Sequence, residues 1–163
     1  MMTNAATLKI TTPGDRELAM TRRFDAPARL VYKAFTTPEI VKQWLGAFGG
    51  WSLVRCDMDV RGGGGYRWEW SKPGVKMMGV SGVYREVVPP LRLVATEQFD
   101  DAWYKGEGLC TIEFVEADGK TTVVQTMTYI SKEVRDGVLE SGMETGVTAS
   151  YDKLAEVLTS LES

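Results

Sequence analysis

The clearest pattern in the sequence is an apolar stripe that runs through its last thirty residues. From Lys132 to Leu161, apolar residues recur at spacings of three and four, which is the period of one face of an α-helix. The pattern predicts one long amphipathic helix over 132–161, with Ser131 as its N-cap and with Arg135, near its start, facing solvent. The stripe consists of Leu139, Met143, Val147, Tyr151, Leu154, Leu158 and Leu161.

Two of the three glycines inside this predicted helix lie on or next to the apolar stripe. Gly146 is on the apolar stripe and Gly142 is beside it. A glycine in a helix costs roughly 1 kcal/mol relative to alanine. We therefore expect that some group near them needs space or approaches the helix closely.

Most of the chain before this helix alternates between apolar and polar residues with a period of two, which is typical of strands with one buried face. Turn signals such as Pro13-Gly14-Asp15 and Asp118-Gly119 separate the strands. We interpret the glycine run Gly62 to Gly65 as a turn, because it matches no phosphate-loop motif and precedes a strand instead of a helix. The predicted strands are Leu8 to Thr11, Glu17 to Phe24, Trp51 to Val60, Tyr66 to Trp70, Met77 to Val88, Arg92 to Phe99, Gly108 to Glu116 and Thr121 to Ile130.

Two short helices are predicted between the second and third of these strands. Asp25 supplies an acceptor just before Pro27, a residue suited to the first turn of a helix, and Pro38 repeats the signal for a second helix that ends near Gly46. An amphipathic terminal helix must bury its stripe, and the remaining chain offers mainly sheet. The predicted fold is therefore α+β, a helix-grip arrangement in which an antiparallel sheet of about seven strands wraps around the C-terminal helix. We expect residues 1–163 to form a single domain.

Composition restricts the classes of partner. Hydrophobic residues make up 44% of the 163 residues and charged residues 25%, and the net charge is −3. These values are typical of an ordinary globular protein and give no reason to expect nucleic acid as a partner. No stretch approaches the eighteen apolar residues that cross a bilayer, and the first residues do not resemble a secretion signal. We expect a cytoplasmic protein without membrane insertion.

The absence of histidine restricts the chemistry further. A chain with no histidine has no Ser-His-Asp or Cys-His nucleophile, and it lacks the commonest metal ligand. Cys56 and Cys110 are far apart in sequence and lie in apolar or alternating runs, so we expect reduced, buried thiols. We predict no metal and no cofactor. Any catalysis has to use carboxylates, tyrosine, lysine or water.

Aromatic residues and one carboxylate are the best candidates for a functional site. Tyr66, Trp68 and Trp70 share one face of a predicted strand. In the next but one strand, alternation places Glu97 between Ala95 and Phe99 on an otherwise apolar face. Such a carboxylate either reaches solvent or pairs with an arginine at the strand end or, if buried, has a raised pKa and can act as an acid, a base or a ligand contact. Glu97 is thus the first, although weak, catalytic candidate.

Four motifs occur together in the order of one known family. They are Phe24-Asp25-Ala26-Pro27, Trp44-Leu45-Gly46, the segment Gly82 to Pro90, and the segment Ser141 to Leu154. With these motifs the chain resembles, from Leu18 to Leu158, the bacterial single-domain proteins similar to the C-terminal domain of the activator of the 90-kDa heat-shock protein ATPase. The resemblance implies a START-like (SRPBCC) fold, a seven-stranded antiparallel sheet that grips a C-terminal helix around a hydrophobic cavity. Residues 1–17 then form an N-terminal extension with a possible extra strand.

Three functions remain open at this point. The leading hypothesis is a non-enzymatic module that binds a small apolar or amphipathic molecule between the sheet and the terminal helix. The alternatives are an enzyme of cyclase or hydrolase type that uses Glu97 with a tyrosine such as Tyr84, and a chaperone partner that acts through its outer surface. A homodimer is also possible. The predicted ligand-binding residues are Trp44, Trp68, Trp70, Tyr84, Glu97, Phe99, Trp103, Met127, Met143, Val147 and Tyr151.

Overall fold

The fold is α+β, with eight strands in one antiparallel sheet. The computed structural model describes residues 7–162 of the chain. Strand order in the sheet is β1-β2-β8-β7-β6-β5-β4-β3. The strands are β1 (Lys9–Thr11), β2 (Glu17–Phe24), β3 (Ser52–Met58), β4 (Gly65–Lys72), β5 (Val75–Val88), β6 (Arg92–Phe99), β7 (Gly108–Ala117) and β8 (Lys120–Thr128). The predicted strands are confirmed, and the extra N-terminal strand, β1, is one more than the seven that the resemblance implies.

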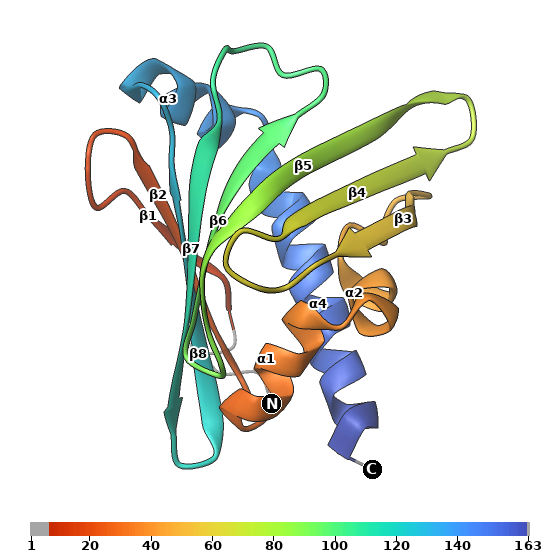
Figure 1. The fold of residues 1–163 in the computed structure, drawn as a ribbon, viewed down its shortest axis with the longest axis vertical. Helices are drawn as coiled ribbons and strands as arrows, with labels where there is room; N and C mark the ends of the chain where they lie inside the picture. The colour runs from red at the N-terminus through yellow and green to blue at the C-terminus, as the bar shows by residue number, and fades with distance from the viewer. Residues whose placement is uncertain (1–6, 163) are drawn as a thin grey trace.

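Four helices accompany the sheet. Helices α1 (Ala28–Thr36) and α2 (Pro38–Trp44) connect β2 to β3, and α3 (Lys132–Glu140) and α4 (Met143–Glu162) follow β8. Figure 1 shows the sheet curved around α4, with the β1–β2 hairpin on one side and the β3, β4 and β5 strands on the other. Helices α1 and α2 both pack against α4. The predicted helix-grip arrangement is therefore confirmed.

The prediction of one continuous terminal helix is wrong, because the helix is interrupted at Ser141 and Gly142. Gly142 has φ +82°, a conformation that glycine adopts without strain and that an α-helix does not contain. The expectation of a crowded Gly142 is also wrong, since a side chain there would meet no atom within 4 Å. At Gly146 the expectation is correct, because an added Cβ would lie 3.0 Å from the ring of Phe48.

Arg135 is buried, with 6% of its surface exposed, and does not face solvent as the sequence predicts. Its guanidinium donates hydrogen bonds from Nη1 to the backbone oxygens of Gly14 and Glu17, at 2.8 and 3.0 Å. Its Nε pairs with Asp136 at 2.8 Å. Arg135 therefore ties α3 to the turn between β1 and β2, and its charge is compensated inside the fold.

Helix starts agree only partly with the predicted caps. The side chain of Ser131 accepts a hydrogen bond from Val134 N, so the predicted N-cap of α3 is confirmed. Asp25 does not cap α1, because Pro27 is the N-cap residue and its side chain makes no capping bond. The first free amide of α1 at Ala28 instead donates to Glu116 Oε1 of β7 at 2.7 Å, which joins the helix to the sheet.

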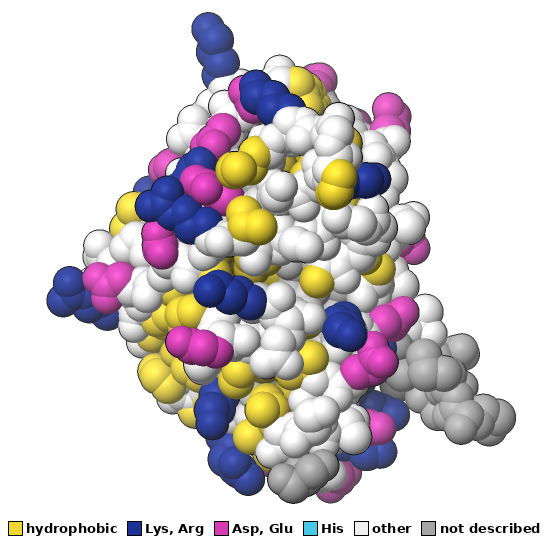
Figure 2. Space-filling view, turned by 90° about the vertical axis from the view of Figure 1, so that its right-hand side faces the viewer, with side chains coloured by type: hydrophobic (Ala, Val, Ile, Leu, Met, Phe, Trp, Pro, Cys, Tyr) yellow, Lys and Arg dark blue, Asp and Glu magenta, His cyan; other side chains and the backbone are white. Residues whose placement is uncertain are grey.

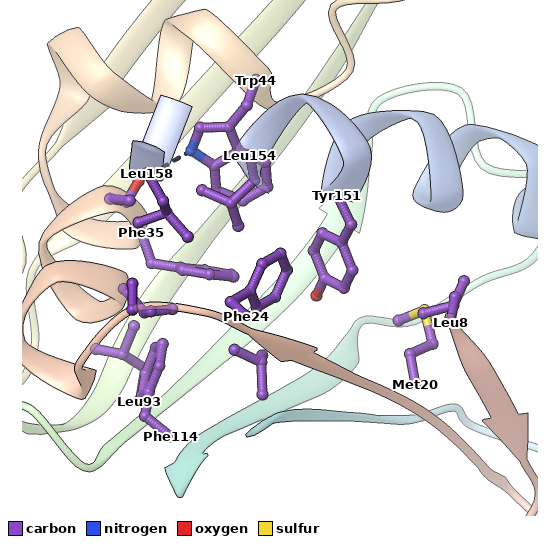
Figure 3. Packing of buried hydrophobic residues seen from close by; sticks show 14 of the residues in the cluster. Leu8, Met20, Phe24, Phe35, Trp44, Leu93, Phe114, Tyr151, Leu154 and Leu158 are labelled. Atoms are coloured by element: carbon purple, nitrogen blue, oxygen red, sulfur yellow. Dashed lines mark hydrogen bonds between the residues drawn. The ribbon is translucent and has the colours of Figure 1, made fainter. Parts of the chain in front are cut away.

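The core lies between α4 and the sheet. Leu154 and Leu158 of α4 are buried and belong to the same cluster as Phe24, Phe35 and Trp44. Figure 3 shows these side chains pointing toward one another from α1, α2, α4 and β2, with the Trp44 nitrogen hydrogen-bonded to the Ala34 oxygen at 3.0 Å. This cluster joins α4 to α1, α2 and the inner face of the sheet.

The outer face of the sheet carries ion pairs. Arg67 forms two hydrogen bonds with the Asp100 carboxylate, at 2.6 and 2.7 Å, and a third with Glu69 at 2.9 Å. On the face seen in Figure 2, positively and negatively charged side chains are intermixed, with hydrophobic side chains between them. Neither charge sign therefore dominates this face.

Candidate ligand-binding pocket

A pocket of about 860 Å³ lies between the inner face of the sheet and helices α2, α3 and α4. Pockets that bind small molecules have volumes of about 300–1,000 Å³ and are mostly apolar with a few placed polar groups. Most of the lining here is apolar or aromatic. The core cluster around Phe35 and Trp44 closes one end of this space, and loops close part of the other.

The structure places all eleven of the predicted ligand-binding residues at this pocket. They come from α2, β4, β5, β6, β8, α4 and the loop between β6 and β7. Most are buried or partly buried, whereas Trp103 is 64% exposed and stands at the rim. The residues are Trp44, Trp68, Trp70, Tyr84, Glu97, Phe99, Trp103, Met127, Met143, Val147 and Tyr151.

One wall is the aromatic face of β4. Alternation along the strand turns Tyr66, Trp68 and Trp70 inward, and successive ring centroids lie 4.5 and 6.3 Å apart. Trp70 Nε1 donates to the oxygen of Leu45 at 3.0 Å, and the Tyr66 hydroxyl donates to the oxygen of Thr96 at 2.7 Å. These bonds satisfy two polar tips and fix the rings, so this wall is preformed.

The opposite wall is α4, and it is joined to the loop after α2. The amide of Gly46 donates to the hydroxyl of Ser150, a buried residue of α4, at 3.0 Å. Gly46 has φ +69°, and an added Cβ there would collide with Trp70 Nε1. The loop can therefore pass tightly between β4 and α4 only because residue 46 is glycine.

Glu97 is the charged residue inside the pocket. It lies on β6 with Ala95 and Phe99, and its side chain lines the space. Within residues 7–162 its carboxylate has neither a hydrogen bond nor an ion pair. Burial raises the pKa of Glu97 from 4.5 to about 7, because the charged form loses hydration without gaining a partner. The structure directs Glu97 into the pocket, whereas the sequence alone left its orientation open.

Four neutral groups surround this carboxylate. Burial, and then the negative charge of Glu97, raise the pKa values of Tyr66, Tyr129 and Tyr104 above the ordinary tyrosine value. The same two causes raise the pKa of the Cys110 thiol. All four therefore stay protonated at neutral pH, so none of them neutralises Glu97.

A short polar chain connects α4 to the sheet at the base of the pocket. The Tyr151 hydroxyl donates to Gln125 Oε1 at 2.8 Å, and Gln125 Nε2 lies 3.4 Å from the sulfur of Cys110. Burial raises the pKa of Tyr151 and keeps its hydroxyl protonated. Both cysteines are free, as the sequence predicts. Gln125 and Tyr151 thus orient each other, whereas the Glu97 carboxylate has no hydrogen-bond partner within residues 7–162.

Two aromatic side chains rest on helix glycines at the rim. The ring of Trp103 lies on Gly137 of α3, where an added Cβ would be 2.5 Å from its Cη2 atom. The ring of Phe48, from the loop after α2, lies in the same way on Gly146 of α4. The glycines therefore let two loops cover the helices beside the opening.

Several lining residues were not identified from the sequence. Gln125 and Tyr129 lie two residues before and two residues after Met127 and point to the same face. Extending the period of two along β8 would therefore have identified them. Tyr104 and Phe48 lie in loops, where no periodicity exists to mark them. Cys110 and Ile112 of β7 also line the pocket.

Residues 7–162 contain no group of three or more Asp, Glu, Cys or His side chains arranged to hold a metal ion. None of the helices in that part of the chain is long and apolar enough to cross a membrane.

An antiparallel sheet curved around a C-terminal helix, with a lined pocket between them, defines a helix-grip protein of the START-like (SRPBCC) class. The chain belongs to the family of activator of Hsp90 ATPase homolog 1-like proteins, whose family model matches residues 25–159. The resemblance inferred from the four motifs is confirmed.

Solved bacterial structures share the whole fold. A protein from Rhodobacter sphaeroides is 28% identical, with a TM-score of 0.89 over 94% of this chain and 99% of its own. One from Chromobacterium violaceum is 25% identical, with a TM-score of 0.72 over 89% and 98%. One from Mycobacterium smegmatis, at 20% identity and a TM-score of 0.80 over 92% and 95%, is similar in fold. None of the curated proteins matches the chain in sequence.

Proposed function

We propose that the protein binds a small apolar or amphipathic molecule in the pocket between the sheet and α4. The observation that carries this proposal is a preformed space of about 860 Å³ with aromatic walls and one unpaired carboxylate inside. Each methylene group that a ligand buries there contributes about 0.8 kcal/mol. A chain of ten carbons therefore gains about 8 kcal/mol from burial, against a cost of association of about 4 kcal/mol or more.

Filling the pocket tests this function. Ala95 lines the pocket beside Glu97 on β6, so the change Ala95→Trp places an indole in the space that the ligand would occupy. We expect wild-type protein to bind 1-decanol saturably in isothermal titration calorimetry, and Ala95→Trp to bind it at least about tenfold more weakly. This factor corresponds to about 1.4 kcal/mol, the burial of roughly two methylene groups.

Val83→Trp is the matched control, because Val83 lies in the same sheet but is 45% exposed and outside the pocket. It should bind decanol like the wild type. Circular dichroism establishes that both variants are folded. Wild-type protein that takes up no decanol would overturn the proposal, and so would equal losses in Ala95→Trp and Val83→Trp.

Proton transfer on a bound molecule is a second candidate function, and the state of Glu97 favours it. A carboxyl with a pKa of about 7 is present in both forms at neutral pH and can accept and donate a proton. Tyr84, predicted above as its partner, lines the same pocket. The fate of a molecule recovered from the protein separates the two functions, because a binding module returns it unchanged and an enzyme alters its mass or structure.

The family description names an activator of the Hsp90 ATPase. A chaperone partner nevertheless stays a prediction for this chain. A homodimer stays a prediction as well. Stimulation of a chaperone ATPase by the purified protein would support an action through the outer surface, and that action would be independent of Ala95 and Glu97.

A further inference from the structure

The interior of the pocket contains the carboxylate of Glu97, and the lysine that lines the pocket, Lys76, stands at its rim. Three charged residues line it, namely Lys76, Glu97 and Asp101. Lys76 and Asp101 are 80% and 65% exposed and pair with each other at 3.1 Å, so both are compensated at the rim. Glu97 is therefore the one charge directed at the interior from the described part of the chain.

The charge of Glu97 discriminates between classes of ligand. In a water-poor space the Coulomb interaction between two charges is several times stronger than in water. A fatty-acid carboxylate would be repelled by ionised Glu97 and would find no cation inside. A ligand with a charged N–H donor would supply the hydrogen bond and the positive charge that the carboxylate lacks.

Aromatic rings around Glu97 favour a cation further. Tyr66, Tyr104 and Tyr129 line the same pocket as Glu97, and its negative charge contributes to the raised pKa of each of them. Ring faces attract ammonium groups through their quadrupoles. An organic ammonium group is thus the head group that benefits from both the carboxylate and the rings, whereas an alcohol benefits from the carboxylate alone.

We propose, building on the proposed function, that the pocket selects amphipathic amines whose ammonium group pairs with Glu97. The apolar body of the amine then occupies the space beside Met127, Met143 and Val147. The other titratable side chains that line the interior, from β4, β5, β7, α4 and the two loops, are neutral at pH 8. They are Tyr66, Tyr84, Tyr104, Cys110, Tyr129 and Tyr151.

The test compares three ten-carbon probes that differ only in the head group. Decylamine, 1-decanol and decanoate are titrated into ligand-free protein at pH 8 and physiological salt by calorimetry. At this pH the amine is protonated and Glu97 is ionised. We expect decylamine to bind at least about tenfold more tightly than decanol, the factor typical of a hydrogen bond to a charged group, and decanoate to bind most weakly.

The variant Glu97→Gln keeps the shape of the side chain and removes its charge. It should lose the preference for decylamine over decanol and retain binding of decanol. Glu113→Gln is the matched control, because Glu113 is exposed on β7 and paired with Arg92; it should keep the preference. Lowering the pH from 8 to 6 protonates Glu97 and should weaken decylamine binding to the wild type, but not to Glu97→Gln.

The outcomes separate the two proposals. Equal affinity of wild type for the three probes, or tightest binding of decanoate, would overturn the selection of amines and leave the binding function standing. Amine preference that persists in Glu97→Gln would also overturn it, because a general attraction of cations to the negative protein would then explain the preference. Failure of all three probes to bind would overturn both proposals.

Discussion

Glu97→Gln is expected to raise the free energy of unfolding at pH 8 by about 3 kcal/mol. Burial shifts the pKa of Glu97 from 4.5 to about 7, so ionising it costs more in the folded protein than in the unfolded chain. Glutamine has no proton to lose and avoids this cost. Most substitutions destabilise a protein, so a gain of this size at one buried position marks a residue retained for another reason.

The sign of the effect depends on pH in a defined way. Between about pH 4.5 and 7 the folded state holds the Glu97 proton and the unfolded state does not, so the contribution of Glu97 to stability decreases as the pH rises. Below pH 4.5 both states are protonated, and the variant should match the wild type. Urea unfolding of both ligand-free proteins at pH 4 and pH 8 measures the difference.

Glu113→Gln is again the control. Glu113 is 49% exposed and pairs with Arg92 at 3.2 Å, a surface contact that contributes about 0–1 kcal/mol. Its substitution should change stability by that amount or less at both pH values. A Glu97→Gln protein that is no more stable than the wild type at pH 8 would show that the carboxylate is well hydrated, and the pocket interior would then not be apolar.

Leu154→Ala is expected to lower the free energy of unfolding by about 2–5 kcal/mol. Leu154 is fully buried on α4 and packs in the cluster that joins α4 to α1, α2 and the sheet. Truncating it leaves a cavity that the surrounding rings cannot fill, because they are fixed by contacts such as those of Phe35 with Trp44 and Phe114. The measurement is urea unfolding followed by circular dichroism.

The matched control is Leu91→Ala, in the turn between β5 and β6. Leu91 is 57% exposed, and its backbone bonds are unaffected by the substitution. A loss of less than about 0.5 kcal/mol is expected there. If Leu154→Ala cost no more than Leu91→Ala, α4 would not be packed against the sheet as described.

The sheet was predictable because its strands alternate in burial along the sequence. Phe24, Phe114 and Met127 are inward positions of β2, β7 and β8, and each is buried. Strand ends differ from the predicted ones by three residues or fewer. The apolar and polar alternation is weaker at the ends of a strand than in its interior, so the ends are harder to predict. The β7–β8 turn was clear from Asp118-Gly119, where both residues have positive φ.

The terminal helix shows where periodicity misleads. Leu139 and Met143 keep the helical spacing across the break between α3 and α4, where Gly142 has a positive φ, so the apolar stripe continues although the helix does not. Arg135 was misplaced for a related reason, because its partners are backbone oxygens of Gly14 and Glu17, more than a hundred residues away. No local pattern records such a contact.

The pocket was predictable in its walls and not in its rim. Strand alternation and the helix stripe identify inward residues such as Trp68 and Val147. Phe48 was missed because it lies in a glycine-rich loop. The path of this loop depends on hydrogen bonds that Leu45 and Gly46 make with the distant side chains of Trp70 and Ser150. The state of Glu97 required the structure, since alternation gives the face of a strand but cannot tell whether a partner reaches it.

The most direct test of pocket binding is a titration of 1-decanol into protein labelled with ¹³C at the methionine methyl groups. Of the eight methionines, Met20, Met77, Met78, Met127 and Met143 line the pocket, with Met127 and Met143 on its sheet and α4 walls, and Met58 of β3 lies outside it. Binding in the pocket predicts saturable shifts of the Met127 and Met143 methyl signals at one equivalent, with the Met58 signal unchanged. Unshifted Met127 and Met143 signals, with or without a change at Met58, would contradict the account.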